Sequence, residues 1–140
     1  MLTPSEVSDR ALFLSPEAPY PLTSGGAMRS SSMLQFLAHS HSVHLVTFRE
    51  SGTPNPVSSL PIGLANPVTV IDLPYHRRAF WARSYRNTAR LLRGVLPLTD
   101  RFGHKTIRHK VLDALDGQYY NLAMVEHFWC APYLPILRKC

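Results

Sequence analysis

The chain has 140 residues, a net charge of +6 and a pI near 9.7, and 45% of its residues are hydrophobic. This length allows a single domain with a real core. The positive charge favours an anionic partner such as nucleic acid, phospholipid or a phosphorylated sugar. No stretch approaches the roughly 18 uninterrupted apolar residues that a membrane-spanning helix needs.

The ends of the chain carry little targeting information. Residues 1–10 are polar and lack the basic start and apolar run of a signal peptide, so we expect a flexible tail followed by one domain over 11–140. Cys130 and Cys140 form neither a disulfide framework nor a zinc-binding pattern. Two reduced thiols are expected, and with them a cytoplasmic location.

The first half of the chain predicts three strands and one helix. Residues 11–15 are apolar on both faces, as expected for a strand of a parallel sheet. A helix is predicted over 24–38, with Met28, Met33, Leu34, Phe36, Leu37 and Ala38 as its apolar members and much of the opposite side Ser and Gln. Residues 43–48 and 68–73 are further strands, separated by a loop rich in proline, glycine and serine.

The second half predicts three helices around a fourth strand. Residues 77–96 have helical periodicity, with one side formed by Trp81, Tyr85, Thr88, Ala89, Leu92 and Leu96. The opposite side carries Arg83, Arg86, Arg90 and Arg93. A helix over 100–115, a strand over 122–125 and a helix over 129–137, interrupted by two prolines, complete the pattern.

This alternation predicts an α/β, Rossmann-like parallel sheet with strand order third-second-first-fourth and helices on both faces. Open sheets of this kind usually have more strands, so we expect a truncated product.

A double glycine stands between the first strand and the first helix. Gly25 and Gly26 follow a proline-rich loop and lie where the helix begins. Glycine lets backbone N–H groups approach a ligand closely, and a helix N-terminus favours a phosphate. The dinucleotide fingerprint is excluded, because its glycines stand in a tight turn directly after the strand. The alternative is an ordinary flexible strand-to-helix turn.

Two polar residues follow the fourth strand. His127 lies where ligands gather in open α/β sheets, beyond the carboxyl ends of the strands, and could hydrogen-bond a sugar hydroxyl. Glu126 could bind acceptor hydroxyls, although strand alternation sends neighbours to opposite faces unless the strand has already ended. The alternative for His127 is a packed or surface histidine beside Phe128 and Trp129.

Other features have more than one interpretation. His39, His41 and His44 straddle a helix end and a strand start without further ligands in reach, so no metal and no cofactor are expected. The helix over 77–96 could lie on an anionic membrane through its arginines or could bury its apolar stripe in the core. Nucleic acid is a minor option, because no binding motif accompanies the arginines.

Three segments resemble a known family. They are the run Leu12-Phe13-Leu14-Ser15-Pro16 with Gly25-Gly26-Ala27-Met28-Arg29, the segment from Leu37-Ala38-His39 to Leu45-Val46-Thr47, and Tyr120-Asn121-Leu122-Ala123-Met124-Val125-Glu126-His127. Together they resemble the N-terminal domain of the retaining GT-B glycosyltransferases of the family-4 (group 1) type. Asn121 replaces a usual aspartate and Ser40 a common glycine. Residues 51–110 show no resemblance.

The resemblance implies two Rossmann-like domains with a cleft between them. The chain would be the acceptor-side half of an enzyme that moves a sugar from a nucleotide-sugar to an acceptor hydroxyl with retention. Gly25 and Gly26 would face the donor diphosphate, His127 would be catalytic, and Glu126 and Arg29 would bind a sugar, lipid-linked or phosphorylated acceptor. This half alone would be inactive. If the basic helix docks, the protein is peripheral to the inner face of the membrane. The competing hypothesis is a non-catalytic Rossmann-like module that binds a nucleotide or anionic partner.

Overall fold

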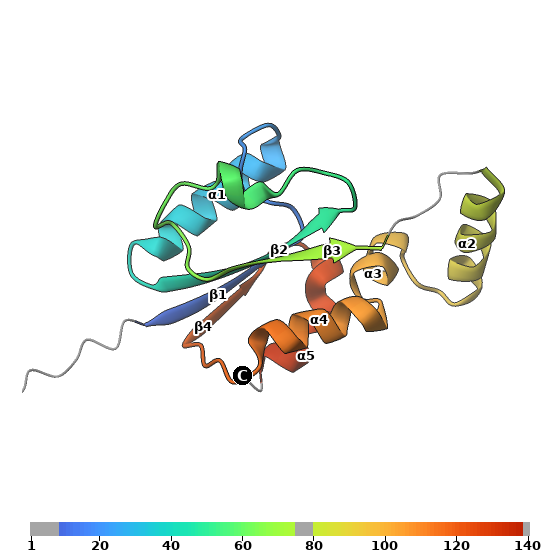
Figure 1. Cartoon of the computed structure of the whole chain (residues 1–140). Helices are drawn as coiled ribbons and strands as arrows, with labels where there is room; N and C mark the ends of the chain where they lie inside the picture. The colour runs from blue at the N-terminus through green and yellow to red at the C-terminus, as the bar shows by residue number, and fades with distance from the viewer. Residues whose placement is uncertain (1–8, 75–79, 139–140) are drawn as a thin grey trace, which may run out of the picture.

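The computed structural model describes residues 9–74 and 80–138, except for the side chains of residues 80, 82 and 83. Residues 1–8 of the tail expected over 1–10, Arg77 and the side chain of Arg83 therefore lie outside the described residues. The fold is α/β, with one four-stranded sheet of order β3-β2-β1-β4 in which every pair is parallel (Figure 1). This is the Rossmann-like arrangement that the sequence predicts.

The strands lie where the apolar runs predict them. They are β1 (Arg10–Ser15), β2 (Ser42–Glu50), β3 (Val68–Leu73) and β4 (Leu122–Val125). The loop between β2 and β3 contains one 3-10 turn, η1 (Pro56–Ser59). Side chains alternate across β1, so that Phe13 packs with α1 on one face while Leu12 and Leu14 join the core on the other.

Helix α1 (Gly25–Ala38) covers the first face of the sheet (Figure 1). Ser24 begins it by accepting a hydrogen bond from the Ala27 amide at 3.0 Å. The expected division of its faces is partly wrong, because Met28 and Phe36 are exposed whereas Ser30 and Ser31 are buried. Ser30 is buried because its hydroxyl is hydrogen-bonded to a carboxylate inside the protein.

The other face is covered by short elements from the second half of the chain. They are α3 (Pro97–Phe102), α4 (Lys105–Leu115), the 3-10 helix η2 (Phe128–Tyr133) and α5 (Leu134–Leu137). The single helix expected over 100–115 is wrong, since Gly103 ends α3 and His104 begins α4. A side chain at position 103 would meet the Thr99 carbonyl oxygen at 2.8 Å, so glycine fits this tight break.

Helix α2 (Phe80–Leu92) departs most from expectation. It ends before the predicted residue 96 and projects beyond the end of the sheet (Figure 1). The hypothesis that its aromatic stripe is core is wrong, because Trp81 is 82% exposed and Tyr85 78%. Its arginine side faces the protein instead, where Arg90 Nε lies 2.8 Å from Asp100 Oδ2. Among the described residues, no helix has the length and apolar character to cross a membrane.

A buried histidine stands among the mostly apolar buried side chains of β2. His44 lies between the Tyr120 hydroxyl, 2.5 Å from its Nδ1, and the Thr69 hydroxyl, 2.9 Å from its Nε2. Burial lowers the pKa of His44 below its ordinary 6.5, and the charge of Arg10 lowers it further. The ring is therefore neutral in the folded protein at neutral pH.

This histidine predicts a loss of stability in mild acid. Below about pH 6.5 the unfolded chain takes up a proton that folded His44 resists. The stability it contributes is therefore complete above that pH and falls as the pH drops toward its folded pKa. Urea unfolding at about pH 7.5 and about pH 5 should give a lower free energy at the acid pH. His44→Gln should flatten this dependence, and an unchanged slope would contradict the assignment.

Candidate functional site

The polar residues singled out by the sequence meet at the carboxyl ends of β1 and β4. The chain leaves β1 for β2 on one side and returns from β3 to β4 on the other, so strand order reverses between β1 and β4. Ligands of open α/β folds bind in the crevice outside the strands at such a switch point. Ser15 ends β1 there, and Glu126 directly follows β4.

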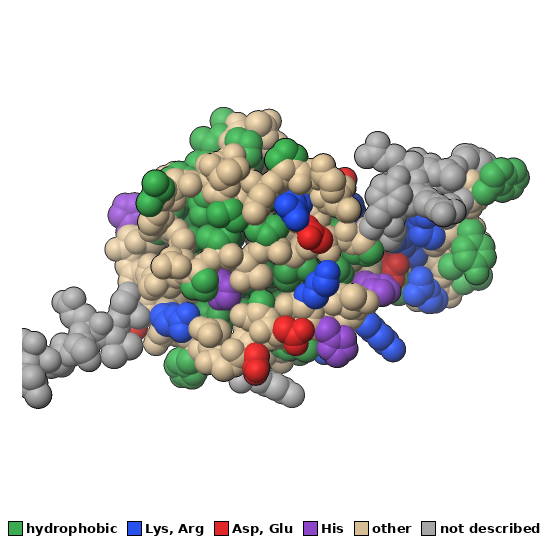
Figure 2. All heavy atoms as spheres, viewed as in Figure 1, with side chains coloured by type: hydrophobic (Ala, Val, Ile, Leu, Met, Phe, Trp, Pro, Cys, Tyr) green, Lys and Arg blue, Asp and Glu red, His purple; other side chains and the backbone are tan. Residues whose placement is uncertain are grey.

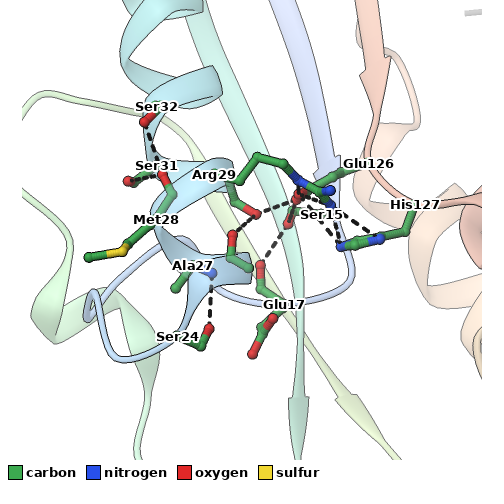
Figure 3. A network of polar contacts seen from close by, with 12 residues as sticks. Ser15, Glu17, Ser24, Ala27, Met28, Arg29, Ser31, Ser32, Glu126 and His127 are labelled. Atoms are coloured by element: carbon green, nitrogen blue, oxygen red, sulfur yellow. Dashed lines mark hydrogen bonds and ion pairs between the residues drawn. The ribbon is translucent and has the colours of Figure 1, made fainter.

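Glu126 is the centre of the cluster (Figure 3). Only 3% of its side chain is exposed. Ser15 Oγ donates to its Oε2 at 2.6 Å, and the Ser30 hydroxyl donates to the same oxygen. Arg29 donates to Oε1 from Nη2 at 3.0 Å and from Nε at 3.2 Å. The carboxylate therefore connects β1, α1 and the end of β4.

These contacts keep Glu126 ionised. Burial alone would raise the pKa of this carboxyl, but hydrogen bonds from Ser15, Ser30 and Arg29 outweigh burial and lower it. A hydroxyl has one hydrogen to donate, and Ser15 and Ser30 each donate it to the Glu126 carboxylate. The backbone carbonyl oxygens of Glu17 and Gly26 lie near these hydroxyls without receiving that hydrogen. The site thus holds a fixed negative charge beneath its surface.

Arg29 links this charge to the surface. Its side chain is 52% exposed, and its Nη2 also lies 2.8 Å from His127 Nε2. A guanidinium has donors only, so this ring nitrogen must accept. We therefore place the hydrogen of a neutral His127 on Nδ1, which is the nitrogen farther from Nη2, at 3.3 Å. In this arrangement Arg29 sets the direction in which His127 can donate.

The backbone of His127 is unusual. Its φ of 66° makes it the one non-glycine residue with positive φ in the described part of the chain. This conformation costs most residues about 1–3 kcal/mol and is concentrated at functional sites. The ring is held by stacking on Trp129, with centroids 4.2 Å apart and planes 8° from parallel. Its side chain is partly exposed, so His127 points to the surface and not into the core.

The double glycine lies in the first turn of α1, one turn before Arg29. A Cβ on Gly25 would meet no atom within 4 Å, so this position faces open space. A Cβ on Gly26 would lie 2.6 Å from the Glu17 carboxylate. Glu17 thus brings a negative charge to the helix N-terminus, where the backbone favours anions. A phosphate that uses these amides must displace the Glu17 side chain.

The structure brings most of the predicted site residues to one edge. Arg29 contacts both Glu126 and His127, because β4 has ended at Val125 and strand alternation no longer separates the two. The acceptor-binding role of Glu126 remains a prediction, although its burial leaves a ligand little access to its carboxylate. The arginines of α2 lie elsewhere, on the helix that projects from the body (Figure 1).

Sequence reasoning missed two members of the cluster. Ser15 and Ser30 hold Glu126, but a serine at a strand end and one inside a helix carry no specific signal. The burial of Ser30 on the sheet side of α1 could have been found only by placing the helix against the sheet. Within the described ranges, no three His, Cys, Asp or Glu side chains gather as a metal site would require.

Comparison with known proteins adds no relative. No protein family, curated protein or solved structure shows a match to this chain. Function must therefore be argued from the site itself.

Proposed function

We propose that this chain is the acceptor-side domain of a GT-B glycosyltransferase that transfers a sugar from a nucleotide-sugar with retention. The observation that carries the proposal is the convergence of Arg29, Glu126 and His127 beside the first turn of α1, at the point where strand order reverses. The resemblance of the Gly25-Gly26 loop and of the segment ending in His127 supports it from the sequence.

In this proposal each part of the cluster has a separate task. The amides at Gly25 and Gly26 stabilise the negative charge that develops on the departing diphosphate, where fixed donors help most. His127 donates from Nδ1 to a hydroxyl of the sugar. Arg29 binds a phosphorylated or acidic acceptor and adds positive charge beside the donor diphosphate, and buried Glu126 holds both Arg29 and His127 in position. No step requires a metal.

The competing function is a non-catalytic module for a phosphate-bearing ligand. The half-exposed Arg29 beside a helix N-terminus favours it, since that pair suits any phosphate. A module of this kind binds UDP and inorganic pyrophosphate equally well. A sugar transferase domain gains affinity when UDP carries glucose, or GDP carries mannose, because its site contacts the sugar.

Calorimetry tests the proposal on the chain as it stands. Arg29→Gln should weaken UDP binding about tenfold, because a charge-assisted contact to phosphate is lost. Gly25→Ala should weaken it as well without loss of stability, since the added methyl enters open space. The matched control is Arg10→Gln at the first residue of β1, on the opposite edge of the sheet, where Arg10 Nη2 lies 2.9 Å from Gln118 Oε1. If the control weakens UDP binding as much as Arg29→Gln does, or if Arg29→Gln has no effect on it, the proposed site is wrong.

The chain alone should not turn over substrate. In the family that it resembles, the acidic motif for the donor sits in the other domain, so the leaving group is not enclosed here. Incubation of the purified 140-residue chain with labelled UDP-glucose or GDP-mannose and a sugar acceptor should give no labelled product. Transfer by preparations free of other enzymes would show that the site is complete in this chain.

A further inference from the structure

Helix α2 and the residues that lead from it into α3 expose a large apolar surface. Trp81, Tyr85 and Leu92 recur at helical spacing and so lie on one side of α2, and Leu92 is 84% exposed. Beside them are further exposed leucines, Leu91, Leu96 and Leu98. Figure 2 shows hydrophobic side chains at the outer end of this segment, farthest from the body. Exposed apolar clusters of this kind mark sites of association.

Residues 80–103 carry most of the net positive charge of the chain. Residues 80–103 contain five arginines and one acidic residue, a net charge of +4 out of +6 for the whole chain. Helix α2 itself contains no aspartate or glutamate. A surface that is both apolar and strongly basic is complementary to a surface that is apolar and anionic.

The arginines also fix which way the helix faces. Arg90 lies 2.8 Å and Arg93 3.7 Å from the Asp100 carboxylate on α3, so this side turns toward the protein and the aromatic side turns outward. Arg93 nevertheless keeps 58% of its side chain exposed, so its charge remains accessible to anions beside the helix.

From this arrangement we propose that α2 docks on the surface of an anionic phospholipid bilayer. Trp81, Tyr85 and Leu92 enter the boundary between headgroups and acyl chains, where tryptophan and tyrosine are favoured, and the arginines attract the phosphates. The helix lies in the plane of the membrane and does not cross it. This inference does not depend on glycosyl transfer. Docking of α2 brings the carboxyl edge of the sheet to a surface where lipid-linked molecules reside.

Vesicle flotation tests the docking. Wild type should float with vesicles of phosphatidylcholine and phosphatidylglycerol, and weakly with phosphatidylcholine alone or in high salt. The variant Trp81→Ser/Tyr85→Ser/Leu92→Ser should bind about tenfold less. Its control, Phe36→Ser/Ile62→Ser/Tyr119→Ser, removes equally exposed apolar side chains elsewhere and should bind as wild type does. Melting curves check that both variants fold.

Two further variants separate the charge from the apolar face. Arg86→Glu/Arg93→Glu should lower binding to the anionic vesicles, whereas Lys105→Glu/Lys110→Glu on exposed positions of α4 should lower it much less. In a Trp129→Phe background Trp81 is the single tryptophan, and its fluorescence should shift to the blue on anionic vesicles.

Three results would overturn the proposal. Wild type and the Trp81/Tyr85/Leu92 variant could float equally. Sedimentation could reveal a dimer that this variant dissociates while vesicles capture neither protein. RNA could bind through the arginines alone while vesicles do not bind.

Discussion

Glu126→Ala should lower the free energy of unfolding by about 3 kcal/mol, the largest loss that we expect from a single polar substitution in this chain. It removes a buried acceptor on which Ser15, Ser30 and Arg29 all converge. Each lost hydrogen bond to a charged group costs about 1.5–3 kcal/mol. The loss at the half-exposed Arg29 is smaller, because water hydrates its guanidinium in the variant. Chemical unfolding of wild type and variant measures the difference.

The pH dependence of this loss has a definite sign. The pKa of Glu126 is lowered from 4.5, so its contribution is present above that pH and is lost as the pH falls through the folded pKa. The gap between wild type and Glu126→Ala should therefore narrow in acid. The control is Glu50→Ala, which removes an exposed partner of Arg101 and should cost at most about 1 kcal/mol. Similar losses for both variants would contradict a central role for Glu126.

At position 127, glycine should give a more stable protein than alanine, which is the reverse of the usual order of stability. His127→Gly should be more stable than His127→Ala by about 1–2 kcal/mol, because glycine adopts positive φ without strain. Both variants lose the stacking on Trp129, so that term cancels in the comparison. Unfolding free energies of the two variants provide the measurement.

A neighbouring strand position serves as the control. Ala123→Gly on β4, where φ is not positive, should show the ordinary order and lose about 0.5–1 kcal/mol. If His127→Gly is less stable than His127→Ala, the backbone at residue 127 is not left-handed. The strain at the site would then be absent, and with it one reason to regard His127 as functional.

The sheet could be predicted closely because its signals are local. The apolar run of β1 specifies a parallel strand buried on both faces, and β3 also begins and ends at the predicted residues. The helices between the strands were harder to predict from the sequence. Gly103 divides a stretch that has continuous helical periodicity, and its need for glycine arises from contact with the Thr99 carbonyl.

Helical periodicity did not predict which side of α2 faces the protein. A helix with an aromatic stripe opposite an arginine stripe normally buries the aromatic side. Here the ion pair between Arg90 and Asp100 turns the arginine side inward. The pairing depends on where α3 lies, and the sequence pattern of α2 alone cannot specify it.

The candidate site was predictable in position but not in its internal contacts. Strand order alone brings the Gly25-Gly26 loop and His127 to one edge of the sheet. The hydrogen bonds of Glu126 to Ser15 and Ser30, and the two-way contact of Arg29, depend on side chains far apart in sequence. The same holds for the positive φ of His127, since no local residue demands it.

The most direct test of the central claim is a nitrogen-15 NMR titration of the whole chain with UDP. If the carboxyl edge binds the diphosphate, the amides of Gly25, Gly26 and Ala27 should shift first, together with His127, and Arg29→Gln should reduce these shifts. Glu17→Gln should strengthen them, because it removes a carboxylate that competes for the same amides. Shifts confined to α2 and α3, with Gly25 and Gly26 unmoved at saturating UDP, would contradict the account.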